Sequence, residues 1–376
     1  MALFSKRRSW PSNPPFLAWF VHRDVSGRVP HSIRLESLKE GNVKKLIAVL
    51  ISVAFIASIG FAAPKTVTLN GYTFKLTTKK PKDIEIAVVY MNVTIPFAQF
   101  IKAGVDAAAK EFGVKAYMTG PTEWGTEPEI QVMENLITKK VDGISVAVLD
   151  IPGLTPIIQK ALKSGIPTTC NNVDAPESGR LGFVGEDLFL AGAATANSVV
   201  AKMGTKGKII VSSVAIGAIW SIKRQDGVMS VLNKYPNIKI VDTINAEGDE
   251  QSAYAALENS YLAHKDITGH ISFGGTDYLW GRVMENKKAG NASSKNPIYS
   301  SGHDLYEEKL IQIKNGWTTS AFGQNPYKQG YEAVKQLYLL LTKGTPPTVI
   351  DTGIIEVNQK NADEFLQKIK DGEPVG

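Results

Sequence analysis

IEIAVVY, at residues 84–90, is the stretch of sequence that decides the fold. Every residue in it except Glu85 is apolar or aromatic, and several are β-branched. A short, continuously apolar run of this kind is typical of a strand that is buried on both faces of a parallel sheet. A helical pattern begins at Pro96 and a second strand is predicted at 114–118. The stretch therefore begins a strand–helix–strand unit.

The same alternation of strand and helix continues almost to the end of the chain. A new strand begins about every 25–30 residues, which is the length of a βαβ unit. Further strands are expected at 143–148, 167–170, 181–184, 208–214, 238–244, 269–273, 298–301 and 319–322. This many units requires two sheets, each covered by helices on both faces. The sequence therefore predicts an α/β protein with two doubly wound parallel-sheet lobes.

The residues ahead of this alternation predict a secretion leader. Lys44 and Lys45 precede an uncharged apolar run at 46–61 that ends in small residues, which is the pattern of a signal peptide. The run has about 16 residues, fewer than the ~20 that span a bilayer, and no Cys stands at its end to carry a lipid anchor. We expect a cleavable signal peptide at 43–62, cut after Ala62. An uncleaved N-terminal anchor is the alternative.

Two further segments flank this leader. Signal peptides begin close to their basic residues, so residues 1–42 are expected to be a non-native or disordered prefix. On the other side, TVTLNGYTFKL at 66–76 places Asn70-Gly71, a type I′ turn dipeptide, between two runs of alternating β-formers. We therefore expect residues 63–80 to form an N-terminal β-hairpin extension.

The charge of the chain is concentrated in its first 62 residues. The net charge of the whole sequence is +6; residues 1–62 hold nine basic and three acidic side chains, and the remainder holds 33 of each. A neutral body has no electrostatic footprint for a polyphosphate, which argues against nucleic acid as a partner. The single Cys excludes an internal disulfide framework and any site that needs two thiols.

Motifs for catalysis, metals and cofactors are missing from the sequence. It contains no G-x-S-x-G nucleophile elbow, no H-E-x-x-H metal motif and no G-x-x-x-x-G-K-[ST] phosphate loop, and no G-x-G-x-x-G follows the first strand. We expect no catalytic residue, no metal and no cofactor. A glycosidase would need a close carboxylate pair, for which Asp277 and Asp304 are the candidates, but nothing in the sequence indicates the raised pKa that such an acid requires.

The loops that follow the predicted strands are rich in amides, carboxylates and large aromatic side chains, with one arginine. Ligands of open parallel sheets bind beyond the carboxyl ends of the strands, where these loops meet. Amides, carboxylates and arginine suit the hydroxyls of a sugar or polyol, and a flat aromatic covers its apolar C–H face. Trp220 and Arg224 lie one helical turn apart and share a face, so we expect both in the site.

Several motifs, in order along residues 83–356, resemble those of the periplasmic sugar-binding proteins of ABC transporters, of the ribose-binding type. Ile95-Pro96-Phe97 resembles the Asn-Pro-Phe-Phe motif of that family, and GIPTTCNN at 165–172 resembles its Gly-Ile-Pro strand with the binding pair that follows. KRQDG at 223–227 matches the segment with the sugar-binding arginine, and Gly302-His303-Asp304 matches a Gly-Phe-Asp motif. PTEW at 121–124 is closer to the branch with rhamnose and autoinducer-sugar receptors.

The resemblance implies a site, an architecture and a partner. Together with the loop analysis, it gives these ligand-binding candidates: Phe97, Trp124, Asn172, Trp220, Arg224, Asp249, Asp277, Asp304 and Gln324. It implies a three-crossing hinge near Val184, Asn325 and Gly353. The lobes would be residues 81–184 plus 325–353 for lobe 1, and residues 185–324 plus 354–376 for lobe 2.

The same resemblance implies that the protein is a periplasmic monomer. It would close on a sugar or polyol and deliver it to an ABC transporter permease. The alternative partner is a membrane sensor kinase, with the same fold acting as a receptor. A lactose-repressor-type regulator is disfavoured, because the leader occupies the place of its DNA-binding helices.

Overall fold

The computed structural model describes residues 65–375. The expected prefix, signal peptide and cleavage site lie outside these residues and stay predictions. Within residues 65–375, no helix is both long enough and apolar enough to cross a lipid bilayer.

A six-stranded parallel sheet forms the centre of lobe 1. Its strands are β3 (Glu85–Val89), β4 (Lys115–Thr119), β5 (Gly143–Val146), β6 (Thr168–Asn171), β7 (Phe183–Gly185) and β13 (Val349–Asp351). They lie in the order β13-β7-β6-β5-β3-β4, and every neighbouring pair is parallel. The predicted first strand is thus an inner strand of this sheet, between β5 and β4.

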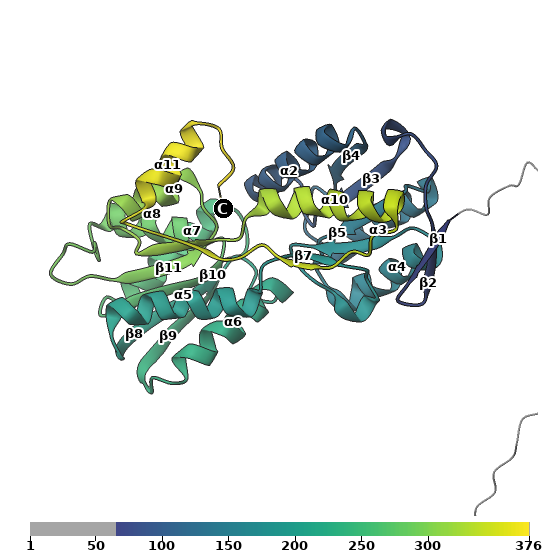
Figure 1. Ribbon diagram of the computed structural model, residues 1–376. Helices are drawn as coiled ribbons and strands as arrows, with labels where there is room; N and C mark the ends of the chain where they lie inside the picture. The colour runs from purple at the N-terminus through teal and green to yellow at the C-terminus, as the bar shows by residue number, and fades with distance from the viewer. Residues whose placement is uncertain (1–64, 376) are drawn as a thin grey trace, which may run out of the picture. The chain divides into compact units, whose positions relative to one another are not determined.

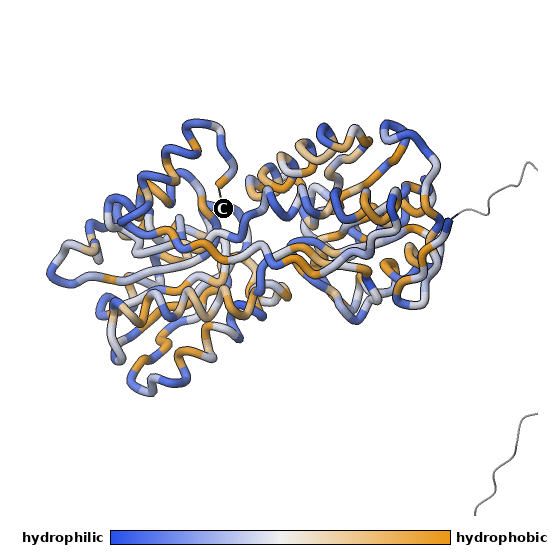
Figure 2. Tube along the Cα trace, viewed as in Figure 1, coloured by the Kyte–Doolittle hydropathy of each residue, from blue (hydrophilic) through white to orange (hydrophobic). Residues whose placement is uncertain are grey.

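Helices cover both faces of the lobe 1 sheet. They are α2 (Pro96–Phe112), α3 (Thr126–Lys139), α4 (Ile151–Lys163) and α10 (Pro326–Lys343). Along β3, Ala87 and Val89 pack into the core with α3 and α4, whereas Ile86 and Val88 pack into the core with α2 and α10. Both faces of the strand are therefore apolar, which explains why IEIAVVY does not alternate with polar residues. Figure 2 shows hydrophobic residues on the segments inside the lobe.

Lobe 2 is built around a second six-stranded sheet. Its strands are β8 (Lys206–Ser213), β9 (Asn237–Asn245), β10 (Gly269–Gly274), β11 (Tyr299–His303), β12 (Ser320–Gly323) and β14 (Ile355–Asn358). They lie in the order β14-β12-β11-β10-β8-β9, parallel except for β14, which is antiparallel to β12.

Six helices surround the lobe 2 sheet: α5 (Leu188–Met203), α6 (Ile219–Leu232), α7 (Glu250–Ala263), α8 (Asp277–Lys287), α9 (Glu307–Lys314) and α11 (Ala362–Lys370). One core cluster holds α5 and α6 and a second holds α7 and α8. A third cluster packs α9 and α11 against β12 and β14.

The chain passes between the two sheets three times. The crossings are β7 to α5, β12 to α10, and β13 to β14 (Figure 1). Two lobes of parallel sheet, linked by three crossings, are the fold class that the sequence predicts, and the structure confirms it.

A two-stranded hairpin, β1 (Thr66–Leu69) with β2 (Tyr72–Lys75), precedes lobe 1. Asn70 and Gly71 at its turn have φ of 50° and 82°, as both central positions of a type I′ turn require. Phe74 is 2% exposed and belongs to the core of lobe 1. The hairpin is therefore packed onto the lobe. Two short 3₁₀ turns, η1 (Pro81–Asp83) and η2 (Pro176–Ser178), complete the described elements.

Two glycines fix the position of helix α6, which carries Arg224. A Cβ on Gly192 of α5 would lie 1.9 Å from the backbone oxygen of Arg224, and one on Gly227 of α6 would lie 1.9 Å from that of Phe189. Any larger residue would push the helices apart. The backbones of α5 and α6 are therefore in close contact beside Arg224, and this contact fixes the position of Arg224 relative to the sheet.

Candidate functional site

A cavity of about 110 Å³ lies where the carboxyl ends of strands from both lobes meet, and residues of both lobes line it. Seven of the nine predicted ligand-binding residues are among its lining residues: Phe97, Trp124, Asn172, Trp220, Arg224, Asp304 and Gln324. One water needs about 10–15 Å³ of such space, so the cavity has room for one molecule of roughly ten heavy atoms. Its size suits a single small ligand.

Aromatic side chains from both lobes form the walls of the cavity. Phe97 lies in the first turn of α2, and its ring centroid is 6.0 Å from that of Tyr90, which follows β3. From lobe 2, Trp220 in the first turn of α6 packs against the lobe 1 core that contains Phe97. Trp124, in the loop between β4 and α3, is 50% exposed. Two rings are thus held by packing and one is largely open to solvent.

Arg224 is fixed by a buried carboxylate. The guanidinium Nε donates to Glu186 Oε1 at 3.1 Å, Nη2 also pairs with Glu186, and Nη1 donates to the backbone oxygen of Phe273 at 3.1 Å. Arg224 is only 4% exposed and its guanidinium lies 5.9 Å from the Trp220 ring. Burial raises the pKa of Glu186, and the charge of Arg224 opposes part of that rise. The arginine is therefore held rigidly at the wall of the cavity.

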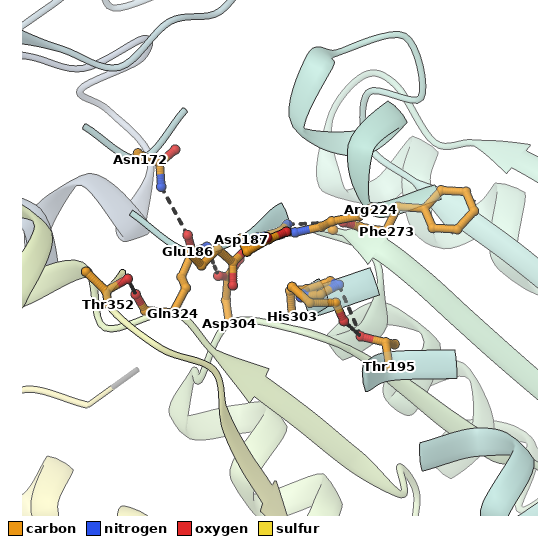
Figure 3. Close-up of polar contacts among 12 residues, drawn as sticks. Asn172, Glu186, Asp187, Thr195, Arg224, Phe273, His303, Asp304, Gln324 and Thr352 are labelled. Carbon is orange, nitrogen blue, oxygen red and sulfur yellow. Dashed lines mark hydrogen bonds and ion pairs between the residues drawn. The ribbon is translucent and has the colours of Figure 1, made fainter. Parts of the chain in front are cut away.

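Gln324 connects both lobes through its side chain. Its Nε2 donates to Asp304 Oδ1 at 2.8 Å in lobe 2, and its Oε1 accepts from Asn172 Nδ2 at 3.1 Å in lobe 1. Its backbone oxygen accepts from Thr352 Oγ1 at 2.8 Å, on the third crossing. Figure 3 shows these contacts, with Asn172 reaching Gln324 from one side and Asp304 from the other. The second and third crossings are thereby tied to two cavity residues.

Three residues of this region have left-handed backbone conformation although none is glycine. The φ angles are 58° at Asn172, 68° at Asp304 and 53° at Asn325. Asn and Asp are the residues that tolerate this conformation best. Strained backbone of this kind is concentrated at binding and hinge positions, where the surrounding structure holds it. The amide and carboxylate of Asn172 and Asp304 are thereby turned toward Gln324.

Asp304 combines burial with a nearby positive charge. Burial raises the pKa of its carboxyl, whereas the Arg224 charge and the hydrogen bond from Gln324 lower it. The adjacent His303 is 1% exposed, and burial holds its pKa well below the ordinary value, so the imidazole is neutral. Its Nε2 lies 3.3 Å from Thr195 Oγ1, inside lobe 2. This histidine packs beneath the cavity and does not line it.

The structure does not bring Asp249 to the cavity. This residue is exposed, and its Oδ1 accepts from the backbone nitrogen of Ser252 at 2.8 Å, which makes it the N-cap of α7. It follows β9, the edge strand of the lobe 2 sheet, so its loop lies to one side of the central strands. We therefore remove Asp249 from the candidate site.

Asp277 also lies away from the cavity. It is 2% exposed and forms an ion pair with the fully buried Lys309, whose Nζ donates to the backbone oxygen of His303 at 2.9 Å. A Cβ on Gly302 would lie 2.7 Å from the Cβ of Asp277. The role that the structure gives Asp277 is to support the carboxyl end of β11, next to Asp304, from beneath.

Sequence reasoning missed three residues that bring polar side chains to the site. Tyr90 and Tyr306 line the cavity, and Glu186 holds Arg224 from behind. All three follow the carboxyl ends of parallel strands, β3, β11 and β7. The rule that identified the other loops therefore applies to them as well, but Tyr90 lies within the predicted strand at 84–90 and nothing in the local sequence singles out Glu186 or Tyr306.

The family of the chain follows from comparison with known proteins. The model of the family described as "Periplasmic binding protein domain" matches residues 86–345. The chain belongs to the periplasmic binding protein family. This membership confirms the expectation of a binding protein rather than an enzyme, and it agrees with two parallel-sheet lobes around a central cavity. Across residues 65–375, no cluster of three or more His, Cys, Asp or Glu residues has the geometry to hold a metal ion.

Individual relatives have modest identity over most of the described chain. The xylose/arabinose-binding protein XylF of Sulfolobus acidocaldarius is 26% identical over 294 residues, which are 74% of this chain and 72% of that protein. The xylitol-binding protein of Mycolicibacterium smegmatis is 30% identical over 217 residues, 57% of this chain and 60% of that one. A solute-binding protein of Burkholderia graminis, solved with D-arabinose, matches with a TM-score of 0.71 at 26% identity and covers 76% of this chain and 98% of its own.

Proposed function

We propose that this protein captures a sugar or sugar-like polyol between its two lobes, outside the cytoplasm, and delivers it to an ABC transporter permease. The observation that carries the proposal is the cavity itself. It combines packed aromatic rings with an arginine, a carboxylate and two carboxamides at the meeting point of both sheets.

Each part of the cavity suits one part of a polyol. Phe97 and Trp220, on opposite lobes, can cover an apolar C–H face. Asp304 accepts hydrogen bonds from hydroxyls, and the free N–H groups of Arg224 donate to their oxygens. Because every hydroxyl both donates and accepts, this mixed set satisfies a polyol better than a ligand with acceptors alone.

Closure of the lobes around the ligand is part of the proposal. The moving units are residues 81–184 plus 325–353 and residues 185–324 plus 354–376. Gln324 sits on the second crossing and contacts residues of both units, Asn172 and Asp304. A ligand that bound both of these residues would favour the closed arrangement over the open one, since it has more contacts there.

The relatives support the ligand class and the location. The names of two relatives specify xylose, arabinose or xylitol, and a similar solved structure holds D-arabinose. Passage across a membrane fits the signal peptide expected at 43–62. N-terminal sequencing of the protein recovered from outside the cytoplasm tests this location, with Ala63 as the expected first residue.

A thermal-shift screen tests the ligand class. The purified protein is heated with D-xylose, D-arabinose, D-glucose, L-rhamnose or xylitol, and a compound that binds only the folded state raises the melting temperature. Calorimetric titration of each hit then gives its Kd, and uptake of the labelled compound by cells with and without the protein tests delivery. A screen without any hit contradicts the proposal. Conversion of a compound to product would contradict the binding-protein assignment.

A further inference from the structure

Glu186 leaves Arg224 with little unbalanced positive charge. The side chain of Glu186 is fully buried and that of Arg224 is 5% exposed. Two nitrogens of the guanidinium, Nε and Nη2, point to the same carboxylate oxygen. Three of the five N–H donors of the arginine are used by Glu186 and Phe273, so two remain for a ligand. The arginine can donate hydrogen bonds, but its charge is already compensated at contact distance.

Asp304 is the second charged residue on the cavity wall. Among the described residues that line the cavity, it and Arg224 are the two that carry a charge. Its Oδ1 accepts from the uncharged amide of Gln324, and no cation of residues 65–375 lies within ion-pair distance of its carboxylate. Arg224 is nearby but is paired with Glu186, so an ionised Asp304 has no ion-pair partner among residues 65–375. With both carboxyls ionised, the three side chains, which Figure 3 shows together, have a net formal charge of −1.

We infer that Glu186 sets the ligand class of this site. Because Glu186 neutralises Arg224 and the Asp304 carboxylate has no ion-pair partner, the cavity accepts uncharged polyols and rejects their carboxylate derivatives. This inference rests on the proposed function and deepens it. An anionic ligand would have to approach the Asp304 carboxylate without a free cation to offset the repulsion, and it would lose its hydration as it entered. A neutral hydroxyl avoids the repulsion, has a smaller cost of lost hydration and donates to the same carboxylate.

The replacement Glu186→Gln removes the charge of this side chain and keeps its size, so it tests the effect of charge separately from that of shape. Glutamine keeps an oxygen that can accept from Arg224 Nε, so the arginine stays in place, but the compensating charge is gone. Arg224 then becomes an available cation on the cavity wall, and the three side chains together become neutral. The matched control is Glu247→Gln, which removes the same charge from an exposed residue of lobe 2 that does not line the cavity.

The experiment compares a neutral compound with its own carboxylate. The neutral probe is the compound of the screen above that binds most tightly, and the anionic probe is its aldonate, for example D-xylonate for D-xylose or xylitol. Calorimetric titration gives the ratio of the two Kd values for each protein. We expect the wild-type protein and the control variant to prefer the neutral probe by tenfold or more. We expect Glu186→Gln to reduce that ratio by about tenfold.

The outcomes separate the inference from the proposed function. Equal binding of both probes by the wild-type protein overturns the inference and leaves the proposed function standing, whereas no binding of any polyol contradicts the proposed function. An unchanged ratio in Glu186→Gln shows that shape or Asp304 alone causes the preference, and this also overturns the role of Glu186. If that variant does not fold, Asp304→Asn removes the other negative charge. The ratio of the two Kd values should fall in Asp304→Asn as well. An unchanged ratio in this variant contradicts the charge argument.

Discussion

Glu129 is a buried carboxyl whose titration opposes folding, and replacing it by glutamine should stabilise the protein increasingly as pH rises. It lies in α3 with none of its surface exposed. Its Oε2 accepts from the backbone nitrogen of Leu149 at 3.3 Å, and its Oε1 has no hydrogen-bond partner among the described residues. Burial raises its pKa from 4.5 to about 8. At neutral pH the folded protein therefore keeps this group protonated, whereas the unfolded chain ionises it.

The magnitude follows from the two pKa values. Because the folded pKa is the higher one, the stability that this group contributes is fully present below pH 4.5 and is lost as pH rises through about 8. Linkage puts the loss at about 0.8 kcal/mol at pH 5 and about 3.3 kcal/mol at pH 7. Glutamine does not titrate, so Glu129→Gln avoids the loss. Any cost of burying its amide is independent of pH.

The assay is urea unfolding of both proteins at pH 5, 6, 7 and 8. The difference in unfolding free energy, variant minus wild type, should grow by about 2.5 kcal/mol between pH 5 and pH 7. Glu134→Gln, on the same helix but in a surface ion pair with Lys160, is the matched control for replacing a glutamate of α3 by glutamine. A difference for Glu129→Gln that stays flat with pH would refute the reasoning, because the carboxyl would then titrate alike in the folded and unfolded chains.

Three further predictions concern the ligand site. Arg224→Ala and Asp304→Ala should each weaken binding of the tightest polyol more than tenfold, over about 1.4 kcal/mol, in calorimetric titration; unchanged Kd values in both would remove these residues from the site. Phe97→Ala and Trp220→Ala should weaken binding through lost ring contact, and the emission of the wild-type protein should shift on binding, a shift that Trp220→Phe reduces. Asp249→Ala should lower the melting temperature through loss of the α7 cap and leave the Kd unchanged; a weaker Kd would return Asp249 to the site.

The sheets could be predicted from the sequence because a strand that is buried on both faces has apolar residues at consecutive positions. IEIAVVY contains apolar residues at successive positions since one set packs under α2 and α10 and the other under α3 and α4. The same logic places the ligand site, because parallel strands all end at one edge. Together with the family resemblance, it selects nine candidate residues, seven of which line one cavity.

Two candidate residues show that a position after a parallel strand is not sufficient to place a side chain in the cavity. Asp249 and Asp277 also follow strands of the lobe 2 sheet, but β9 is an edge strand and Asp277 turns inward to Lys309. Neither the order of strands in a sheet nor the partner of a buried charge can be read from local sequence. Glu186 was missed for the same reason, because its importance depends on Arg224, a residue 38 positions away.

The third crossing has a consequence for how the protein is made. β13 completes the edge of one sheet and β14, a few residues later, completes the edge of the other, while α10 supplies part of the lobe 1 core. A ribosome releases the chain from its N-terminus onward, so neither lobe can finish folding until nearly the last residues have been synthesised. This order delays completion of both sheets until almost the end of synthesis. It also means that a nonsense mutation near the 3′ end of the coding sequence would damage both lobes at once.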